Sequence, residues 1–148
     1  MMRKLLEQAK KHTSIAATLS YEEKQRALFA MADSLILHQE EILLENRKDL
    51  EEASGISSVM KDRLRLSEER IFSMAEGIRN VAKLPDPVGR VLEERQTENG
   101  LLIRKVSVPF GVVAVIFESR PNVAADTAAL CLASGNVSLL RGGKESFR

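Results

Sequence analysis

The chain has 148 residues, of which 44% are hydrophobic and 29% are charged, a composition sufficient for a folded domain with its own core. Its 22 basic and 21 acidic residues nearly cancel, which argues against a broad surface for nucleic acid. No stretch approaches the roughly 20 consecutive apolar residues of a membrane span, and the first residues lack the apolar segment of a signal peptide. We therefore predict a cytoplasmic protein that binds neither nucleic acid nor membranes.

The sequence offers little for disulfide or metal chemistry. Cys131 is the single cysteine, so no disulfide can form within the chain. The two histidines, His12 and His38, are far apart and do not have the spacing of metal ligands. We predict no metal site.

The first half of the chain has the pattern of charged, amphipathic helices. A helix is predicted over about the first 15 residues. Its apolar face comprises Leu5, Leu6, Ala9 and Ile15. Ser20 and Glu23 have the spacing of a capping box, and the periodic segment after them predicts one helix of about 30 residues that ends near Gly55.

A second helix start lies at Ser67, which Glu68 and Glu69 follow in the first turn. The apolar positions after it recur at helical spacing, at Ile71, Met74, Ala75, Ile78 and Ala82. Pro85 and Pro87 end this helix and mark the boundary between a helical half and a strand-rich half.

Residues 91–107 contain two strand-like segments around Asn99 and Gly100, a pair that favours a tight type I′ turn. They predict a charged β-hairpin with a two-residue loop. In that register Arg95 faces Arg104, an unfavourable pair, so the alignment of the strands stays open by about one residue. Because a two-stranded ribbon is marginally stable alone, we expect it to pair with another sheet, in this chain or in a neighbouring subunit.

The most informative segment, residues 108–144, has the pattern strand, helix, strand. The apolar run from Val112 to Phe117 is rich in β-branched residues and suits a strand buried on both faces. A helix is expected from about Asn122, with a left-handed cap at Gly135, and a second apolar run extends from Val137 to Leu140. A connection of roughly 20 residues suits a right-handed β-α-β crossover.

In open α/β sheets, ligands bind beyond the carboxyl ends of the strands, which here are residues 118–122 and 141–144. Neither standard nucleotide motif is present: no two glycines stand two apart, as G-x-G-x-x-G requires, and Lys144 lacks the following Ser or Thr of a Walker A loop. Arg141 and Lys144 flank two glycines at a strand end. Such a loop can bind a phosphate, or it can be a solvated basic turn.

Four segments carry a resemblance to a known family: LPDPVG (84–89), VPFGVVAVIFESRPN (108–122), ALCLASGN (129–136) and LLRGGKE (139–145). They resemble the N-terminal portion of γ-glutamyl phosphate reductase, also called glutamate-5-semialdehyde dehydrogenase, of the aldehyde dehydrogenase superfamily. The resemblance implies an α/β, aldehyde dehydrogenase-like fold. Residues 1–88 would be the N-terminal helical part of the cofactor domain, 89–108 a β-hairpin for oligomerisation, and 109–148 the incomplete start of a Rossmann-like NADPH-binding domain.

The resemblance implies NADPH-dependent reduction of L-glutamyl 5-phosphate to L-glutamate 5-semialdehyde with release of phosphate, in proline biosynthesis. In the family a cysteine thiolate attacks the acyl phosphate, and hydride from the cofactor reduces the resulting thioester. A homo-oligomer is expected, and glutamate 5-kinase is a candidate pathway partner.

The resemblance also assigns roles to residues at the two strand ends. Four residues match the strand end that lies along the cofactor in this superfamily, namely Ile116, Phe117, Glu118 and Ser119. Arg141 and Lys144 match the next strand end, near the adenosine ribose, where two cations suit the 2′-phosphate of NADPH. Glu118 has a structural alternative, as a helix cap or as a partner of Arg120.

Arg120 and Asn122 lie at the elbow where relatives place an amide side chain that stabilises the developing oxyanion. The ESRPN sequence departs from the pattern of those relatives. Either residue can therefore serve the oxyanion or hold the acyl phosphate.

Cys131 does not fit the role of nucleophile, because it falls in the middle of an apolar helix with no adjacent base or cation. The catalytic cysteine is expected beyond residue 148, so we expect this chain to be a fragment that is inactive alone. Two hypotheses stay open. The chain is either an enzyme fragment with cofactor-facing elements or a non-catalytic assembly or interaction module.

Overall fold

The computed structural model describes residues 2–118 and 120–146. In chain order its elements are α1 (Met2–Thr18), α2 (Tyr21–Leu37), α3 (Gln39–Glu52), α4 (Ser58–Leu64), α5 (Glu68–Ala82), β1 (Val91–Gln96), β2 (Leu102–Val106), β3 (Val112–Ile116), α6 (Pro121–Ala133), β4 (Val137–Arg141) and a 3-10 turn, η1 (Lys144–Ser146). Within the described residues, none of the helices has the length and apolar character needed to cross a bilayer.

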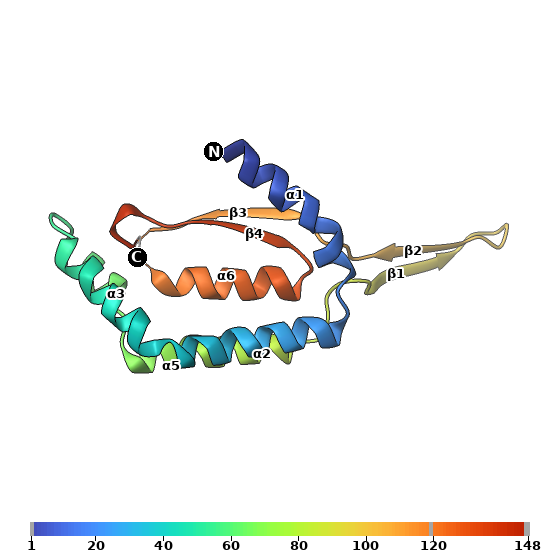
Figure 1. Cartoon of the computed structure of the whole chain (residues 1–148). Coiled ribbons are helices and arrows are strands. Elements are labelled where there is room, and N and C mark those ends of the chain that lie inside the picture. The colour runs from blue at the N-terminus through green and yellow to red at the C-terminus, as the bar shows by residue number, and fades with distance from the viewer. Residues whose placement is uncertain (1, 119, 147–148) are drawn as a thin grey trace.

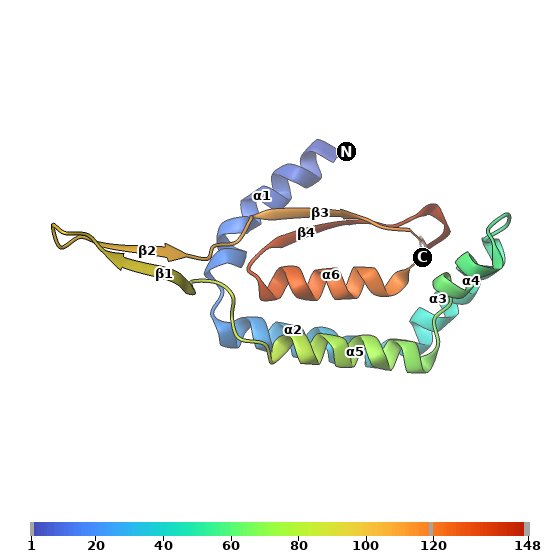
Figure 2. The same ribbon diagram turned by 180° about the vertical axis from the view of Figure 1, so that it is seen from behind.

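The body of the molecule has three layers, and a ribbon extends from one end of it. β3 and β4 form the upper layer, α6 lies directly beneath them, and α2 and α5 lie side by side beneath α6 (Figures 1 and 2). α1 crosses the other face of the strands and contacts both of them. The α/β class predicted from the sequence is therefore present, as helices with two small sheets.

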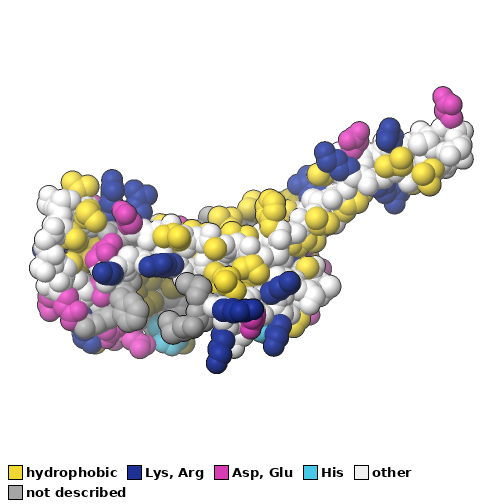
Figure 3. Space-filling model, turned by 90° about the horizontal axis from the view of Figure 1, so that it is seen from above, with side chains coloured by type: hydrophobic (Ala, Val, Ile, Leu, Met, Phe, Trp, Pro, Cys, Tyr) yellow, Lys and Arg dark blue, Asp and Glu magenta, His cyan; other side chains and the backbone are white. Residues whose placement is uncertain are grey.

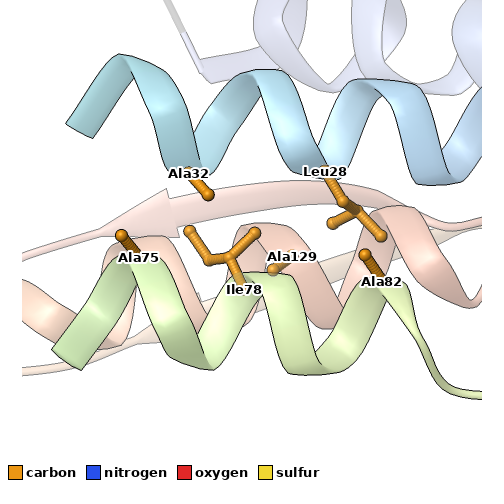
Figure 4. Packing of buried hydrophobic residues seen from close by; sticks show 6 residues of the cluster. All are labelled: Leu28, Ala32, Ala75, Ile78, Ala82 and Ala129. Atoms are coloured by element: carbon orange, nitrogen blue, oxygen red, sulfur yellow. The ribbon is translucent and has the colours of Figure 1, made fainter. Parts of the chain in front are cut away.

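The core lies where α2, α5 and α6 meet. Small residues let the three helices approach closely, and two branched side chains fill the space between them (Figure 4). The cluster consists of Leu28, Ala32, Ala75, Ile78, Ala82 and Ala129. All five residues of the apolar stripe predicted for α5 are buried, which confirms that prediction.

The N-terminal helix is confirmed, but most of the apolar face predicted for it is open. Ala9 is buried, whereas Leu5, Leu6 and Ile15 are about half exposed, at 49%, 46% and 59%. In this chain α1 therefore buries little apolar surface beyond its contact with β3 and β4.

The single long helix predicted after Ser20 is wrong, because it is broken at His38 into α2 and α3. The capping box at its start is confirmed: the Ser20 hydroxyl accepts the Glu23 N–H, and the Glu23 carboxylate accepts the Ser20 N–H. At the break, His38 Nδ1 donates to the Ser34 carbonyl oxygen at 2.9 Å, in addition to the backbone N–H of His38 at 3.0 Å. This extra bond and a ψ of 17° at His38 redirect the chain.

A short helix that the sequence pattern did not predict, α4, precedes α5. Ser57 caps it by accepting the Met60 N–H, and α4 ends at Leu64, whose side chain is fully buried. With seven residues, α4 is too short to show a helical repeat in the sequence. The start of α5 at Ser67 is confirmed, since its hydroxyl accepts the Arg70 N–H.

The β1–β2 hairpin is confirmed, but its turn is not type I′. Type I′ requires positive φ at Asn99 and at Gly100, and among the described residues only glycines have positive φ. Gly100, at 83°, instead closes a three-residue loop in which the Thr97 N–H donates to Leu101 O at 2.9 Å. The loop therefore has the form of a turn followed by a left-handed glycine.

The longer loop shifts the hairpin register by one residue from the alignment predicted with a two-residue loop. Glu94 now faces Arg104, and the two side chains form an ion pair with Oε2 and Nε 2.5 Å apart, while Arg95 faces Ile103. The like-charge pair of the predicted alignment is thereby avoided. The hairpin extends from the body as an arm that carries basic, acidic and hydrophobic side chains (Figure 3).

The β-α-β unit is confirmed, with β3 and β4 parallel and paired from Val112 opposite Val137 to Ile116 opposite Arg141. The expected burial of β3 on both faces is wrong for this chain, because its residues are half-buried or exposed. Asn136 joins the starts of the two strands, since its buried side chain accepts the Gly111 N–H at 2.9 Å. Gly135 has the predicted left-handed φ, at 71°, and no room for a side chain. A Cβ there would lie 2.9 Å from Pro109 Cγ.

A buried ion pair ties α2 to the connection between α5 and β1. Lys24 is 2% exposed, and its ammonium donates to both carboxylate oxygens of Asp86, at 3.0 and 2.9 Å. Asp86 also accepts the Val88 N–H at 2.9 Å. One residue further along α2, Gln25 donates to the Ala82 carbonyl at 2.8 Å. α2 thus holds both the last residue of α5 and the connection that follows it.

Candidate functional site

The carboxyl ends of β3 and β4 meet at one edge of the sheet. Ile116 pairs with Arg141, and the Phe117 N–H donates to the Arg141 carbonyl at 3.0 Å. Ile116 is 80% exposed, so a large apolar side chain faces outward beside a guanidinium-bearing residue. The structure therefore places residues from the two predicted strand ends next to one another.

A cavity of about 490 Å³ opens at the end of β3, and we call it the strand-end cavity. It is lined by Met60, Arg63, Ile116, Phe117, Glu118, Arg120 and Val123. Three of the residues predicted to contact the cofactor thus share a cavity with Arg120. Within the described structure no ion pair joins Glu118 to Arg120, so the pairing considered for Glu118 is not formed.

A second cavity, of about 440 Å³, lies beside the first, and we call it the arginine cavity. It is lined by Asp62, Arg63, Arg65, Leu66, Arg70, Ser73, Met74, Arg120, Asn122 and Asp126. Arg63 and Arg120 line both cavities, so the two spaces are neighbours along the start of α6.

The elbow between β3 and α6 presents Arg120 and Asn122 in different ways. Arg120 is the N-cap residue of α6 and is exposed, and Pro121 occupies the first helical position. Asn122 is half-buried, and its amide Nδ2 donates to the Asp126 carboxylate at 3.1 Å. Arg120 thus reaches both cavities, whereas the Asn122 amide lies against a carboxylate one turn along α6.

Two further predicted cofactor residues lie at and just after the end of β4. Arg141 is the last residue of β4, and Lys144 opens η1 after two glycines. Both side chains are exposed. Ser119 lies outside the described residues.

Sequence reasoning missed Arg63 and Arg65 as candidate site residues. They come from α4 and from the residue that caps its end, about 55 positions before the elbow in the sequence. The available signal was the concentration of arginines in RLRLSEER (63–70), immediately before the N-cap Ser67. Without the fold, nothing in that segment indicates that it lies beside Arg120.

The described residues contain no group of three or more His, Cys, Asp or Glu side chains that could hold a metal ion. Cys131 is 6% exposed in the second half of α6, and burial raises the pKa of its thiol. Its environment is therefore that of a packed, protonated cysteine.

We expect the Cys131 thiol to react with a disulfide reagent at least about ten-fold more slowly in the folded chain than in urea at the same pH, because it is buried and its pKa is raised. Absorbance of the released thiolate measures both rates. Equal rates in the two conditions would show that this cysteine is accessible and would return it to the candidate nucleophiles.

Comparison with known proteins gives a consistent result. No family model matches the chain. Over 145 residues it is 54% identical to the γ-glutamyl phosphate reductase of Carboxydothermus hydrogenoformans, and over 146 residues 53% identical to that of Koribacter versatilis. These matches cover 97% and 99% of the chain but 35% and 36% of the relatives. The chain therefore spans about a third of the length of the curated relatives it matches.

Solved structures agree with the sequence comparison. The crystal structure of γ-glutamyl phosphate reductase from Thermotoga maritima matches with a TM-score of 0.91 and 38% identity, over 95% of this chain and 34% of that chain. The Saccharomyces cerevisiae enzyme matches with a TM-score of 0.93 and 38% identity, over 97% of this chain and 37% of that one. The predicted resemblance of this chain to the N-terminal portion of γ-glutamyl phosphate reductase is confirmed.

Proposed function

We propose that this chain supplies the cofactor-facing and substrate-facing elements of an NADPH-dependent γ-glutamyl phosphate reductase. The reaction would reduce L-glutamyl 5-phosphate to L-glutamate 5-semialdehyde and release phosphate, as a step of proline biosynthesis. The observation that carries the proposal is the meeting of the β3 and β4 ends beside the ESRPN elbow, in a chain 54% identical to a named reductase. We also propose that the fold is the start of the Rossmann-like domain of the aldehyde dehydrogenase superfamily.

The residues at the sheet edge fit NADPH in their chemistry. Arg141 and Lys144 are both exposed cations, and a 2′-phosphate is a group that charge-assisted donors bind well. The 80% exposed Ile116 offers an apolar surface next to Arg141, suited to a ring or a ribose face. Gly142 is exposed, whereas the Glu145 carboxylate lies against Gly143, so a phosphate bound between the two cations would have to displace that side chain.

The bound cofactor would supply hydride, and the chain's own residues would bind and orient. Arg141 and Lys144 would hold the 2′-phosphate end, while Ile116, Phe117 and Glu118 would line the path toward the elbow. We assign the oxyanion-facing role to Arg120 in preference to Asn122, because Arg120 lines both cavities, whereas the Asn122 amide is oriented by its bond to Asp126. Ser119 keeps its predicted place among the cofactor residues.

Cys131 supplies no nucleophile in this proposal, because it is buried within α6 and burial raises the pKa of its thiol. The nucleophilic cysteine would therefore come from a part of the enzyme other than residues 1–148. We accordingly propose that the chain by itself does not turn over substrate.

The hairpin, residues 89–108, is proposed as an oligomerisation element of the enzyme. Every residue of β1 is exposed, and the arm offers unpaired outer edges on both strands as well as apolar side chains such as Val91 and Leu92, at 52% and 59% exposure. A homo-oligomer, a cytoplasmic location and an association with glutamate 5-kinase rest on the family resemblance.

NADPH titration tests the cofactor role. The chain is expected to bind NADPH more tightly than NADH, and the double variant Arg141→Ala with Lys144→Ala should weaken NADPH binding at least about ten-fold, since each charge-assisted bond contributes about 1.5–3 kcal/mol. Quenching or transfer of nicotinamide fluorescence measures the affinity.

A variant with the same loss of charge, Lys10→Ala with Lys11→Ala, lies on the exposed side of α1 and is expected to bind NADPH as the parent chain does. No measurable affinity in the intact chain would favour the alternative of a non-catalytic assembly module. Equal affinity for NADPH and NADH would show that Arg141 and Lys144 do not bind the 2′-phosphate.

A further inference from the structure

We propose that Arg63 and Arg65, together with Arg120, form an anion groove that binds the phosphate group of the acyl phosphate substrate. The substrate's identity rests on the proposed function, whereas the anion site follows from the side chains themselves. Arg63 and Arg65 belong to a segment that the sequence pattern did not connect with the elbow, and the fold brings them to it.

The groove is the pair of adjoining cavities described above. Arg63 and Arg120 line both the arginine cavity and the strand-end cavity, and Arg65 lines the first of them. A ligand in the arginine cavity would therefore lie beside the same two arginines as a ligand at the end of β3. A substrate bound along the groove can thus place one end near the predicted cofactor edge and its phosphate among the arginines.

The charges in the groove are not balanced internally. The groove is lined by four arginines, Arg63, Arg65, Arg70 and Arg120, and by the carboxylates of Asp62, Glu118 and Asp126. Asp62 accepts from Arg70 Nη2 at 3.4 Å, and Asp126 accepts from the Asn122 amide at 3.1 Å. Arg63, Arg65 and Arg120 form no ion pair in the part of the chain that the structure describes. The four arginines outnumber the three carboxylates, so the groove has a local excess of positive charge.

The backbone of the segment that carries Arg63 and Arg65 is held in place by the side chains of Asn46 and Arg70. Buried Asn46 on α3 donates from Nδ2 to Leu64 O at 2.9 Å and accepts the Leu66 N–H on Oδ1 at 2.8 Å. The backbone on both sides of Arg65 is therefore fixed by one amide side chain. Such support is what a preorganised binding site requires.

Arg70 adds a second clamp to the same segment. Its Nη1 donates to the backbone carbonyls of Asp62, at 2.6 Å, and of Arg65, at 2.5 Å. Arg70 is thus committed to holding the end of α4, and Arg63 and Arg65 remain to bind a ligand. One arginine thus fixes the backbone while its neighbours are left for a ligand, which is the arrangement of a preorganised binding site and not of a solvated basic surface.

Phosphate is the anion that suits this groove best. Guanidinium groups bind phosphate oxygens in a bidentate manner, and several arginines can share a group with three terminal oxygens. The start of α6 adds the positive end of a helix dipole at Arg120 and Asn122. A single carboxylate, with two oxygens and one charge, would use fewer of these donors.

Titration of the 148-residue chain with inorganic phosphate at low ionic strength, followed by amide NMR, tests the proposal. We expect shifts that concentrate in residues 62–66 and 120–123. Arg63→Gln with Arg65→Gln should weaken phosphate binding at least about ten-fold, and Arg65→Lys should weaken it less, because lysine keeps the charge but loses the planar fork.

A matched control is Arg26→Gln with Arg47→Gln, which removes the same charge from exposed positions on α2 and α3 and should leave phosphate affinity unchanged. If the control and the groove variant lose phosphate affinity equally, the loss is due to net charge alone and the proposal is overturned. Shifts absent from residues 62–66 would overturn it as well.

Two further measurements distinguish the anion groove from the cofactor site and from a site for carboxylates. Arg141→Ala with Lys144→Ala should leave phosphate affinity unchanged, so that a failure of NADPH binding and a failure of the anion groove are read independently. L-Glutamate should neither shift residues 62–66 nor displace phosphate. Tighter binding of glutamate than of phosphate at these residues would assign the groove to carboxylates and contradict the proposal.

Discussion

Replacing Asp86 with alanine is expected to lower the free energy of unfolding by about 3–5 kcal/mol, because it leaves the ammonium of Lys24 buried without its partner. The Lys24 side chain is 3% exposed, and its ammonium donates to both carboxylate oxygens of Asp86. The substitution also removes the acceptor of the Val88 N–H. Urea denaturation followed by far-UV circular dichroism measures the change.

Two comparisons isolate the effect of the unpaired ammonium. Replacing both members of the pair, Lys24→Met with Asp86→Leu, should recover most of the loss, because the buried charge is gone as well. Glu7→Ala removes the partner of Arg3 from an exposed ion pair and should change stability by less than about 0.5 kcal/mol. A loss below about 1 kcal/mol for Asp86→Ala would show that water reaches Lys24 at little cost.

Ile78→Ala should lower the free energy of unfolding by about 2–5 kcal/mol, since Ile78 is 1% exposed and fills the space between α2, α5 and α6. Its neighbours in the cluster are Leu28 and four alanines, which have little freedom to move into the cavity left behind. The higher helix propensity of alanine offsets only a few tenths of a kcal/mol. Chemical denaturation again gives the value.

The matched control is Phe72→Ala on the same helix, where the side chain is 56% exposed. It removes a larger side chain but should cost less than about 1 kcal/mol, because little packing is lost. Ile78→Val, which deletes one methylene group, should cost about 0.5–1.5 kcal/mol. A larger loss for Phe72→Ala than for Ile78→Ala would mean that the core lies elsewhere than the three-helix cluster.

Local signals predicted most of the fold because they act within a few residues. The capping box at Ser20 and Glu23, the N-cap at Ser67 and the left-handed cap at Gly135 are each satisfied by short-range bonds or by one backbone angle. The parallel pairing of Val112–Ile116 with Val137–Arg141 was also predictable, since apolar runs that flank a helix have few other arrangements.

Two wrong predictions, the single long helix and the type I′ turn, arose where one hydrogen bond or one loop residue decides between two structures. The apolar repeat continues through His38, so periodicity does not show that its ring competes for the Ser34 carbonyl. Asn99 and Gly100 are compatible with either a two-residue or a three-residue loop, and the Glu94–Arg104 ion pair accompanies the longer one. Such choices depend on contacts that the sequence pattern does not contain.

Some residues of the candidate site were predictable from local sequence, and others were not. Arg120, Asn122 and Arg141 follow strands directly, so their place at the sheet edge was predictable from the order of elements. Arg63 and Arg65 reach the same edge only because α3 turns at His38 and α4 folds back toward α6. That placement depends on long-range packing, which no local pattern in residues 58–66 reports.

Because α3 starts at the turn at His38, the number of residues after His38 fixes the direction in which each side chain of α3 points. Asn46 holds the Leu64–Leu66 backbone because it emerges from α3 at one angle about the helix axis. Each residue gained or lost between His38 and Asn46 would turn that angle by roughly 100° and direct the amide away from its two backbone partners. A residue gained or lost at the tip of the hairpin, near Glu98, would instead change the pairing of β1 with β2 and leave the Leu64–Leu66 backbone in place. Length changes in these two exposed segments should therefore disturb different parts of the chain.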